Sequence, residues 1–244
     1  MTEMLSLRTK IEQSPMGAYQ WMIVVMAAIM NLLDGFDVLA LAFTATAIRG
    51  EFGLTGIELG YLLSAGLFGM TAGSLFLAPL ADKIGRRPLL LMAVSLSAIG
   101  MLGSAFISQY QWLGFWRVIT GLGVGGILVG TNVITSEYSS RKWRSFAISV
   151  YAAGFGIGAV LGGMFAVMLQ GEYGWRSVFL AGAILTGLLL VVLFIWLPES
   201  IDFLTSKQPK NAEVRLNLIA KKIGLASDWK LPEKAEKVKT KLPI

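Results

Sequence analysis

The sequence contains no cysteine and no histidine. The absence of cysteine excludes disulfide bonds, thiolate metal sites and a cysteine nucleophile. The absence of histidine removes the commonest metal ligand and the side chain that changes charge most readily near neutral pH. Any proton chemistry must therefore fall to carboxylates, and we expect neither a metal site nor a cofactor.

Charged residues are also scarce. They make up 15% of the chain, against about 25% in a typical soluble domain, whereas 55% of the residues are hydrophobic. This composition indicates a membrane protein. The net charge is +6, but the basic residues flank apolar runs, so membrane-side loops explain them better than nucleic acid does. We therefore expect the lipid bilayer, and no nucleic acid, among the partners.

Six apolar runs are each long enough to cross a bilayer as a helix, which needs about 20 residues. The two interior loops between paired spans hold three cations each, whereas the outer loops hold at most one arginine, Arg49 or Arg176. Because cytoplasmic loops carry the positive excess, we predict a multi-pass protein of the inner (cytoplasmic) membrane with both termini cytoplasmic. The predicted spans are residues 21–48, 57–79, 89–107, 112–136, 146–169 and 178–197.

The expected fold class is an all-α membrane protein whose six transmembrane helices form two three-helix repeats. We divide the chain into a cytoplasmic amino-terminal segment (1–20), a six-helix bundle (21–200) and a cytoplasmic linker segment (201–244). Within the linker, residues 211–223 are predicted to form a short amphipathic helix at the membrane surface. The last dozen residues have the composition of disorder. No cleavable signal peptide is expected, because the first apolar run is too long and lacks a cleavage site.

Two of the predicted spans carry ionisable side chains at depth, where such groups are costly and usually functional. In the first span, Asn31, Asp34 and Asp37 recur every three residues and so share one helix face. The fourth span carries Arg117 near its outer end and Asn132 further in. These groups either line a cavity for substrate or protons, or one aspartate pairs with Arg117 to hold the bundle together.

Glycines recur at helix-packing spacing in the second, fourth and fifth spans, where they let helix backbones approach closely. This spacing favours either static packing or a sliding contact in a moving interface. We expect the glycine faces of the second and fifth spans to have no evident partner among the six spans. The third and sixth spans hold no ionisable residue, so we expect them to face lipid all round. The glycines concerned are Gly69, Gly73, Gly121, Gly123, Gly125, Gly154, Gly158 and Gly162.

The loop between the second and third spans is short and densely charged, and it reads LADKIGRRP over residues 80–88. Its glycine permits a sharp turn between two helix ends. The loop resembles the G-x-x-x-D-[RK]-x-G-R-[RK] pattern of major facilitator superfamily transporters, with Ala78 in place of the leading glycine. The matching residues are Asp82, Lys83, Gly85, Arg86 and Arg87.

Further motifs extend this resemblance over about residues 20–200. The run RVITGLGVGG that begins at Arg117 is similar to the superfamily's fourth-helix motif, and Glu137 and Arg144 reproduce a glutamate-x6-arginine spacing of sugar-porter-like and organic-acid members. The sequence around Glu199 is similar to the motif that ends the sixth helix. The run DGFD, residues 34–37, resembles that of the aromatic acid/proton symporters.

The resemblance implies half of a twelve-helix transporter that imports small carboxylates, such as benzoate or muconate, together with protons. It implies roles in substrate binding or proton coupling for Asp34, Asp37 and Arg117, to which we add Asn132. It also implies a cytoplasmic gate that holds the halves together. The residues of the gate are Asp82, Lys83, Gly85, Arg86, Arg87, Glu137, Arg144 and Glu199.

Several alternatives stay open. The chain could be a sugar-porter-like or other organic-anion transporter, or a half that does not transport. We expect no enzyme, because an aspartyl intramembrane protease needs aspartates on two helices and a Gly-x-Gly-Asp motif. One half has no opposing wall for a central cavity, so the expected partners are a small organic acid, protons and a carboxyl-terminal six-helix half. The chain would then be a truncation, one product of a split gene or a half that needs a partner.

Overall fold

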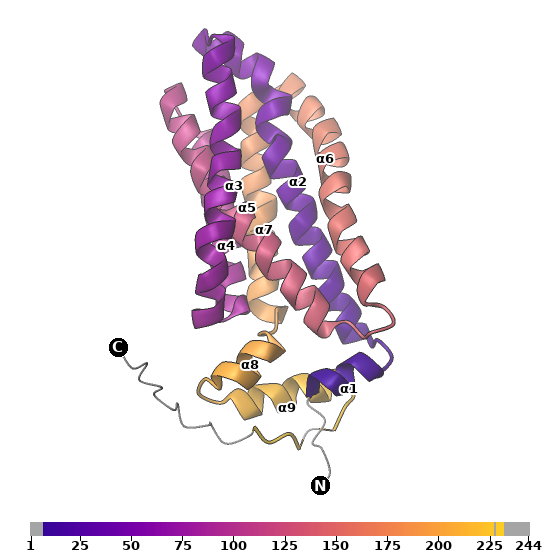
Figure 1. Cartoon of the computed structure of the whole chain (residues 1–244). Helices are drawn as coiled ribbons and strands as arrows, with labels where there is room; N and C mark the ends of the chain where they lie inside the picture. Colours follow the sequence, from indigo (N-terminus) through magenta and orange to yellow (C-terminus); the bar gives the residue numbers. More distant parts are fainter. Residues whose placement is uncertain (1–6, 227, 232–244) are drawn as a thin grey trace, which may run out of the picture.

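The computed structural model describes residues 7–226 and 228–231, and over these residues its regular structure is helical, without a strand. Six of the helices are long and apolar enough to cross a membrane. They stand side by side as one bundle (Figure 1), which confirms the prediction of an all-α membrane fold with six spans. These helices are α2 (Ala18–Phe52), α3 (Gly56–Ile84), α4 (Arg86–Ala105), α5 (Tyr110–Tyr138), α6 (Arg144–Tyr173) and α7 (Trp175–Trp196).

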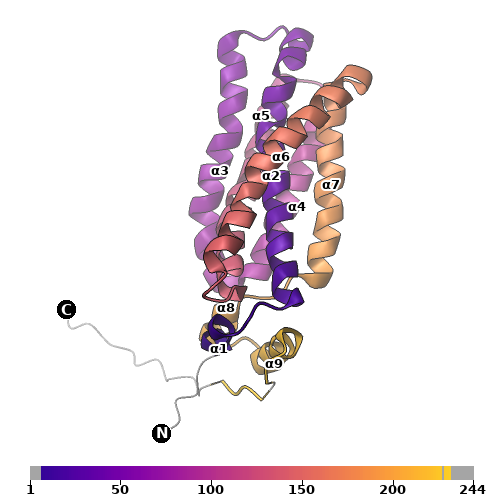
Figure 2. The same cartoon turned by 90° about the vertical axis from the view of Figure 1, so that its right-hand side faces the viewer.

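Three shorter helices, α1 (Leu7–Gln13), α8 (Ile201–Lys207) and α9 (Ala212–Ile223), lie across one end of the bundle, here called the α9 end (Figures 1 and 2). The predicted helix at 211–223 corresponds to α9, whereas α1 and α8 were not predicted. The apolar face of α9 packs on protein, because Leu216 and Ile219 are buried in the cluster that also contains Ile23 of α2. The prediction of disorder for the last dozen residues falls outside the described part of the chain.

The helix ends follow local sequence signals. At the start of α3, the Thr55 hydroxyl accepts from the Glu58 backbone N–H, and the Glu58 carboxylate accepts from the Thr55 N–H at 2.8 Å. This reciprocal capping box satisfies two backbone donors that the helix leaves free. Gly85 separates α3 from α4 and has a φ of +106°, which side-chain-bearing residues rarely adopt. The two helices therefore turn sharply within the charged loop.

The closest helix pairs cross between the two three-helix units: α3 packs on α5, and α2 packs on α6. A Cβ added at Gly69 of α3 would overlap the backbone of Val118 in α5, and one at Gly158 of α6 would overlap the Leu32 carbonyl in α2. The expectation that the glycine faces of the second and fifth spans have no partner was therefore wrong. The remaining glycines make similar close contacts: Gly73, Gly121 and Gly125 between α3 and α5, Gly154 and Gly162 between α6 and α2, and Gly123 between α5 and α4.

The third and sixth spans do not face lipid all round, contrary to the expectation. Half of the most apolar stretch of α4 is buried, against 17% in α3 and 22% in α6. α4 packs on α5 and α7, and α7 also packs on α2. The error has a physical cause: lipid tails are as apolar as leucine, so an uncharged helix fits a bundle interior as well as it fits lipid. The large exposed faces belong instead to α3 and α6.

Candidate functional site

The polar face predicted on the first span is buried inside the bundle. The Asn31 amide donates to the Tyr151 carbonyl at 2.8 Å, and the Ser97 hydroxyl donates to Asp37 Oδ2 at 2.5 Å. One oxygen of each aspartate, Oδ2 of Asp34 and Oδ1 of Asp37, is buried without a hydrogen-bond partner among the described residues. A buried carboxylate oxygen without a partner is costly. These oxygens are therefore available to a proton, an ion or a substrate group.

Arg117 is buried on α5, and its hydrogen bonds go mainly to hydroxyl groups rather than to carboxylates. Its Nη2 donates to Ser104 Oγ at 2.8 Å and to Thr120 Oγ1 at 3.0 Å. The guanidinium also lies 4.8 Å from the ring centroid of Phe179. No ion pair joins it to either aspartate in the described part of the chain. The arginine is thus held in place while its positive charge is not paired with a carboxylate.

Asp37 and Arg117 line one small cleft between α2, α3 and α5, which the side chains of Leu62 and Thr120 also border. The cleft has a volume of about 40 Å³. A water needs about 10–15 Å³ of such space, so the cleft has room for only a few waters. Asn132 is exposed on α5 and does not line the cleft. Of the four predicted coupling residues, the structure places only Asp37 and Arg117 at this cleft, with Asp34 one turn away from Asp37 along α2.

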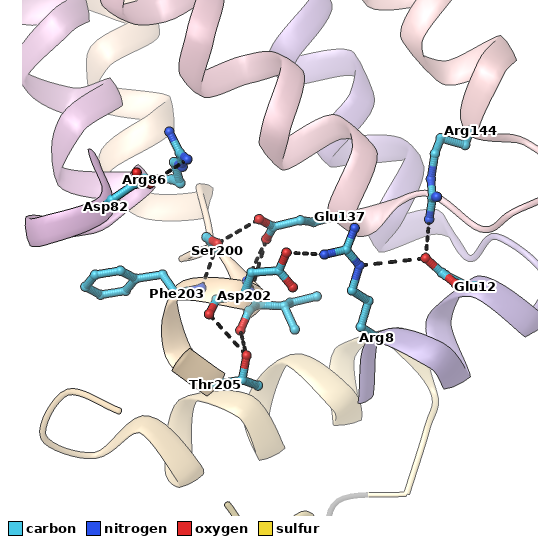
Figure 3. A network of polar contacts seen from close by, with 11 residues as sticks. Arg8, Glu12, Asp82, Arg86, Glu137, Arg144, Ser200, Asp202, Phe203 and Thr205 are labelled. Atoms are coloured by element: carbon cyan, nitrogen blue, oxygen red, sulfur yellow. Dashed lines mark hydrogen bonds and ion pairs between the residues drawn. The ribbon is translucent and has the colours of Figure 1, made fainter. Parts of the chain in front are cut away.

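The residues predicted for the gate lie at the α9 end and form separate contacts: Figure 3 shows the pair of Asp82 and Arg86 apart from Glu137 and Arg144. On one side, Arg86 pairs with Asp82 at 2.8 Å within the loop, where Lys83 is exposed. Glu199 accepts from the Arg87 backbone N–H at 3.0 Å. Its carboxylate also occupies the space that a Cβ at Gly85 would need. The charged loop is thereby joined to the end of α7.

On the other side, Glu137 anchors the start of α8. It accepts from the Ser200 hydroxyl at 2.9 Å and from the Ile201 backbone N–H at 2.8 Å. Arg144 does not pair with Glu137 but donates to Glu12 of α1 at 2.7 Å. A glutamate near a helix N-terminus is stabilised by the free N–H groups there. Glu137 and Arg144 thus bind different short helices at the α9 end.

Sequence reasoning missed the ion pairs of α1. Arg8 pairs with Asp202 of α8 and lies 3.7 Å from Glu12, so that α1 connects α8 with the start of α6 (Figure 3). The hydrogen bond from Arg144 lowers the pKa of Glu12 below its ordinary value. Arg8 and Glu12 belong to none of the motifs found in the predicted spans, because both residues precede the first apolar run.

Sequence reasoning also missed the hydroxyl partners of the site, Ser97 and Ser104. They lie seven residues apart in the third span, in which Ser95 is the third serine, and this spacing places them on one face of α4. That spacing was the one signal in the sequence that could have found them. The serines attach Asp37 and Arg117 to the same helix.

Comparison with known proteins matches residues 27–232 to the Major Facilitator Superfamily. The chain is 35% identical over 210 residues to the gallate transporter of Pseudomonas putida, covering 86% of this chain and 47% of that protein. It is 34% identical over 234 residues to the 4-hydroxybenzoate transporter PcaK of Pseudomonas aeruginosa, covering 95% of this chain and 52% of that protein. The chain therefore spans about half the length of the curated relatives it matches.

The fold also matches solved structures. The proton:xylose symporter XylE, bound to a sugar analogue, superposes with a TM-score of 0.76 at 22% identity, covering 85% of this chain and 50% of that one. The matched relatives are transporters rather than enzymes, as expected from the sequence. With the family match over most of its length, this chain belongs to the Major Facilitator Superfamily.

Proposed function

We propose that this chain is the amino-terminal half of a proton-coupled importer of small aromatic acids. The observation that carries the proposal is the cleft shared by Arg117 and Asp37, which approach one another without an ion pair. A buried, unneutralised guanidinium attracts a carboxylate, and a neutral sugar offers it no charge. Relatives named as transporters of gallate, 4-hydroxybenzoate and benzoate support the choice of aromatic acids.

Coupling to protons follows from the charges at the cleft. When Asp37 is ionised, its negative charge opposes the entry of a second carboxylate beside Arg117. Protonation of Asp37 removes that repulsion, so the anion and the proton bind together. Asp34 also has a carboxylate oxygen without a hydrogen-bond partner among the described residues, so it can accept a proton. It serves as a second proton site on the same helix. In this scheme, the serine partners on α4 position the charged groups and take no proton.

A substrate-sized cavity needs a further wall beyond this half, because the cleft itself, with a volume of about 40 Å³, has room for only a few waters. We assign that wall to a carboxyl-terminal six-helix half packed against α3 and α6, the two most exposed spans. In the proposed orientation, the protein lies in the inner membrane with the α9 end in the cytoplasm. The gate residues then lie on the cytoplasmic side.

The experiment that tests this function measures uptake of labelled 4-hydroxybenzoate into proteoliposomes that contain both halves. Asp37→Asn should abolish accumulation driven by a pH gradient and retain some substrate exchange, because exchange needs no net proton movement. Asp34→Asn should be at least as damaging. The matched control is Glu172→Gln, which removes an exposed carboxylate that does not line the cleft and should accumulate substrate like the wild type.

Two results would refute the proposal. Full gradient-driven accumulation by both aspartate variants would remove the carboxylates from coupling. Saturable accumulation by this chain alone, without a second half, would show that the cavity is not shared between two halves.

A further inference from the structure

A second hollow lies at the α9 end, where the start of α4, the end of α7 and α9 meet. It has a volume of about 230 Å³ and is lined by three cations, Arg87, Arg215 and Lys222. The single carboxylate in its lining, Glu199, already accepts backbone hydrogen bonds, so it leaves the cations in excess. This basic hollow therefore carries a net positive charge, from residues on two helices that are far apart in the sequence.

The three cations have no carboxylate partner within the described residues. Arg87 donates to the Phe194 carbonyl at 2.6 Å, yet its Nε is buried and has no hydrogen-bond partner among the residues that the structure describes. Lys222 lies 5.1 Å from the ring centroid of Tyr19. A buried N–H without an acceptor is costly, and the exposed Arg215 and Lys222 add two further cationic donors to the lining of the basic hollow.

An apolar groove lies beside this hollow, between α4 and α7, where Phe194 lines the groove and the next residue, Ile195, lines the hollow. It has a volume of about 680 Å³ and contains almost no polar surface. Phe194 joins the two spaces, because it lines the groove while its carbonyl holds Arg87 of the basic hollow. The groove is lined on one side by Leu91, Leu96 and Ile99 of α4 and on the other by Leu190 and Val191 of α7.

We propose that one anionic glycerophospholipid occupies both spaces, with its phosphate among Arg87, Arg215 and Lys222 and an acyl chain in the α4–α7 groove. A soluble anion has no apolar chain to bind in the groove, and a zwitterionic lipid offers less negative charge to the three cations. Basic pockets beside transmembrane helices bind anionic lipid head groups. The pocket thus combines the two chemistries of one lipid molecule.

The depth of the pocket agrees with that ligand. Trp196 at the end of α7 lines the basic hollow and is 54% exposed, as expected of an aromatic side chain at the level of the lipid head groups. Leu218 of α9 also lines the hollow and is 55% exposed, although it is apolar. Figure 2 shows α9 below the end of α7, at the edge of the bundle. An apolar side chain in this position is covered when lipid fills the pocket.

Binding can be measured on the whole chain by native mass spectrometry in detergent, and this readout does not depend on transport. The probes are palmitoyl-oleoyl phosphatidylglycerol, the matching phosphatidylethanolamine, and glycerophosphoglycerol, which has the anionic head group without chains. We expect preferential binding of phosphatidylglycerol. The double variant Arg215→Gln/Lys222→Gln should weaken it about 30-fold, because each cation near an anionic lipid contributes about fivefold.

The matched control is Lys210→Gln/Lys221→Gln, which removes two exposed charges beside or on α9 that do not line the pocket. It should bind like the wild type. The conservative double variant Arg215→Lys/Lys222→Arg should retain binding, which excludes loss of α9 as the cause. Ser95→Trp fills the apolar groove without a change of charge and should also weaken binding.

Three outcomes would overturn the proposal. The first is equal affinity for phosphatidylglycerol and phosphatidylethanolamine. The second is the same loss of binding in the double variant and its control. The third is competition by glycerophosphoglycerol at the same concentration as the lipid, which would make the hollow a site for a free anion.

Discussion

The contact between α2 and α6 can be tested by two glycine substitutions that lie two residues apart. Gly158 and Gly156 are both inside α6, and alanine improves the helix propensity of each by a similar amount, about 1 kcal/mol. Their surroundings differ. A Cβ at Gly158 would overlap the Leu32 carbonyl, whereas a Cβ at Gly156 would have no atom of the described residues within 4 Å outside its own helix. Because the propensity gain cancels between the two variants, their difference reports the overlap alone.

The expected size of this difference follows from overpacking. Forcing an extra carbon into a close contact costs about 1–3 kcal/mol. The obstructing atom is a backbone oxygen, so no side-chain rotation relieves the overlap. For a chain of this size, 1 kcal/mol shifts the melting temperature by about 2–4 °C. Gly158→Ala should therefore melt roughly 2–12 °C below Gly156→Ala.

The assay is thermal unfolding of the purified chain in one detergent, followed by circular dichroism, with both variants and the wild type scanned at the same rate. Gly156→Ala should melt at or above the wild-type temperature. If the two variants melt together, α2 and α6 do not approach as closely as described. The packing role of the glycines would then have to be abandoned.

Two further results are expected. Because Arg144 lowers the pKa of Glu12 below its ordinary value of 4.5, their ion pair stabilises the fold fully above that pH and is lost as the pH falls through the lower folded-state pKa; the protection factors of the α1 amides, which are corrected for the intrinsic exchange rate at each pH, should therefore fall on acidification, and Glu12→Gln should show the lower protection already at pH 7. Arg117→Lys keeps the charge but loses the planar fork whose Nε and Nη2 both donate to Ser104; it should lower stability by about 2 kcal/mol, and a melting temperature equal to the wild type would contradict the described contacts.

Much of the bundle was predictable from the sequence, because a bilayer imposes its thickness on every span. The predicted runs agree with α2 to α7 to within a few residues at most ends, although α2 and α3 extend further than their apolar cores. The turn at Gly85 was predictable for a different reason: a glycine between two helix ends usually allows the backbone to turn sharply. The prediction of Asp37 and Arg117 as neighbours at one site rested on the cost of charge at depth.

The pairing of helices was not predictable, since spacing identifies a small-residue face but not what it meets. Gly158 could have faced any neighbouring backbone. Likewise, nothing in the order of residues indicated that Arg117 would bind hydroxyls of α4 rather than Asp37. The helix α1 was not predicted because its seven residues contain only two buried apolar side chains, Leu7 and Ile11. These two side chains pack into the main hydrophobic cluster, and α1 also forms ion pairs with residues more than a hundred positions away.

The pairing of α2 with α6 has a consequence for how the protein is made. Asn31 and Gly35, on either side of Asp34, contact Tyr151 and Phe155 of α6. Roughly 120 residues separate the end of α2 from the end of α6, so at about 5–20 residues per second the ribosome takes roughly 6–24 s to supply the partner. During that interval α2 holds a carboxylate that lipid disfavours. The insertion machinery must shelter the first span until the fifth has emerged.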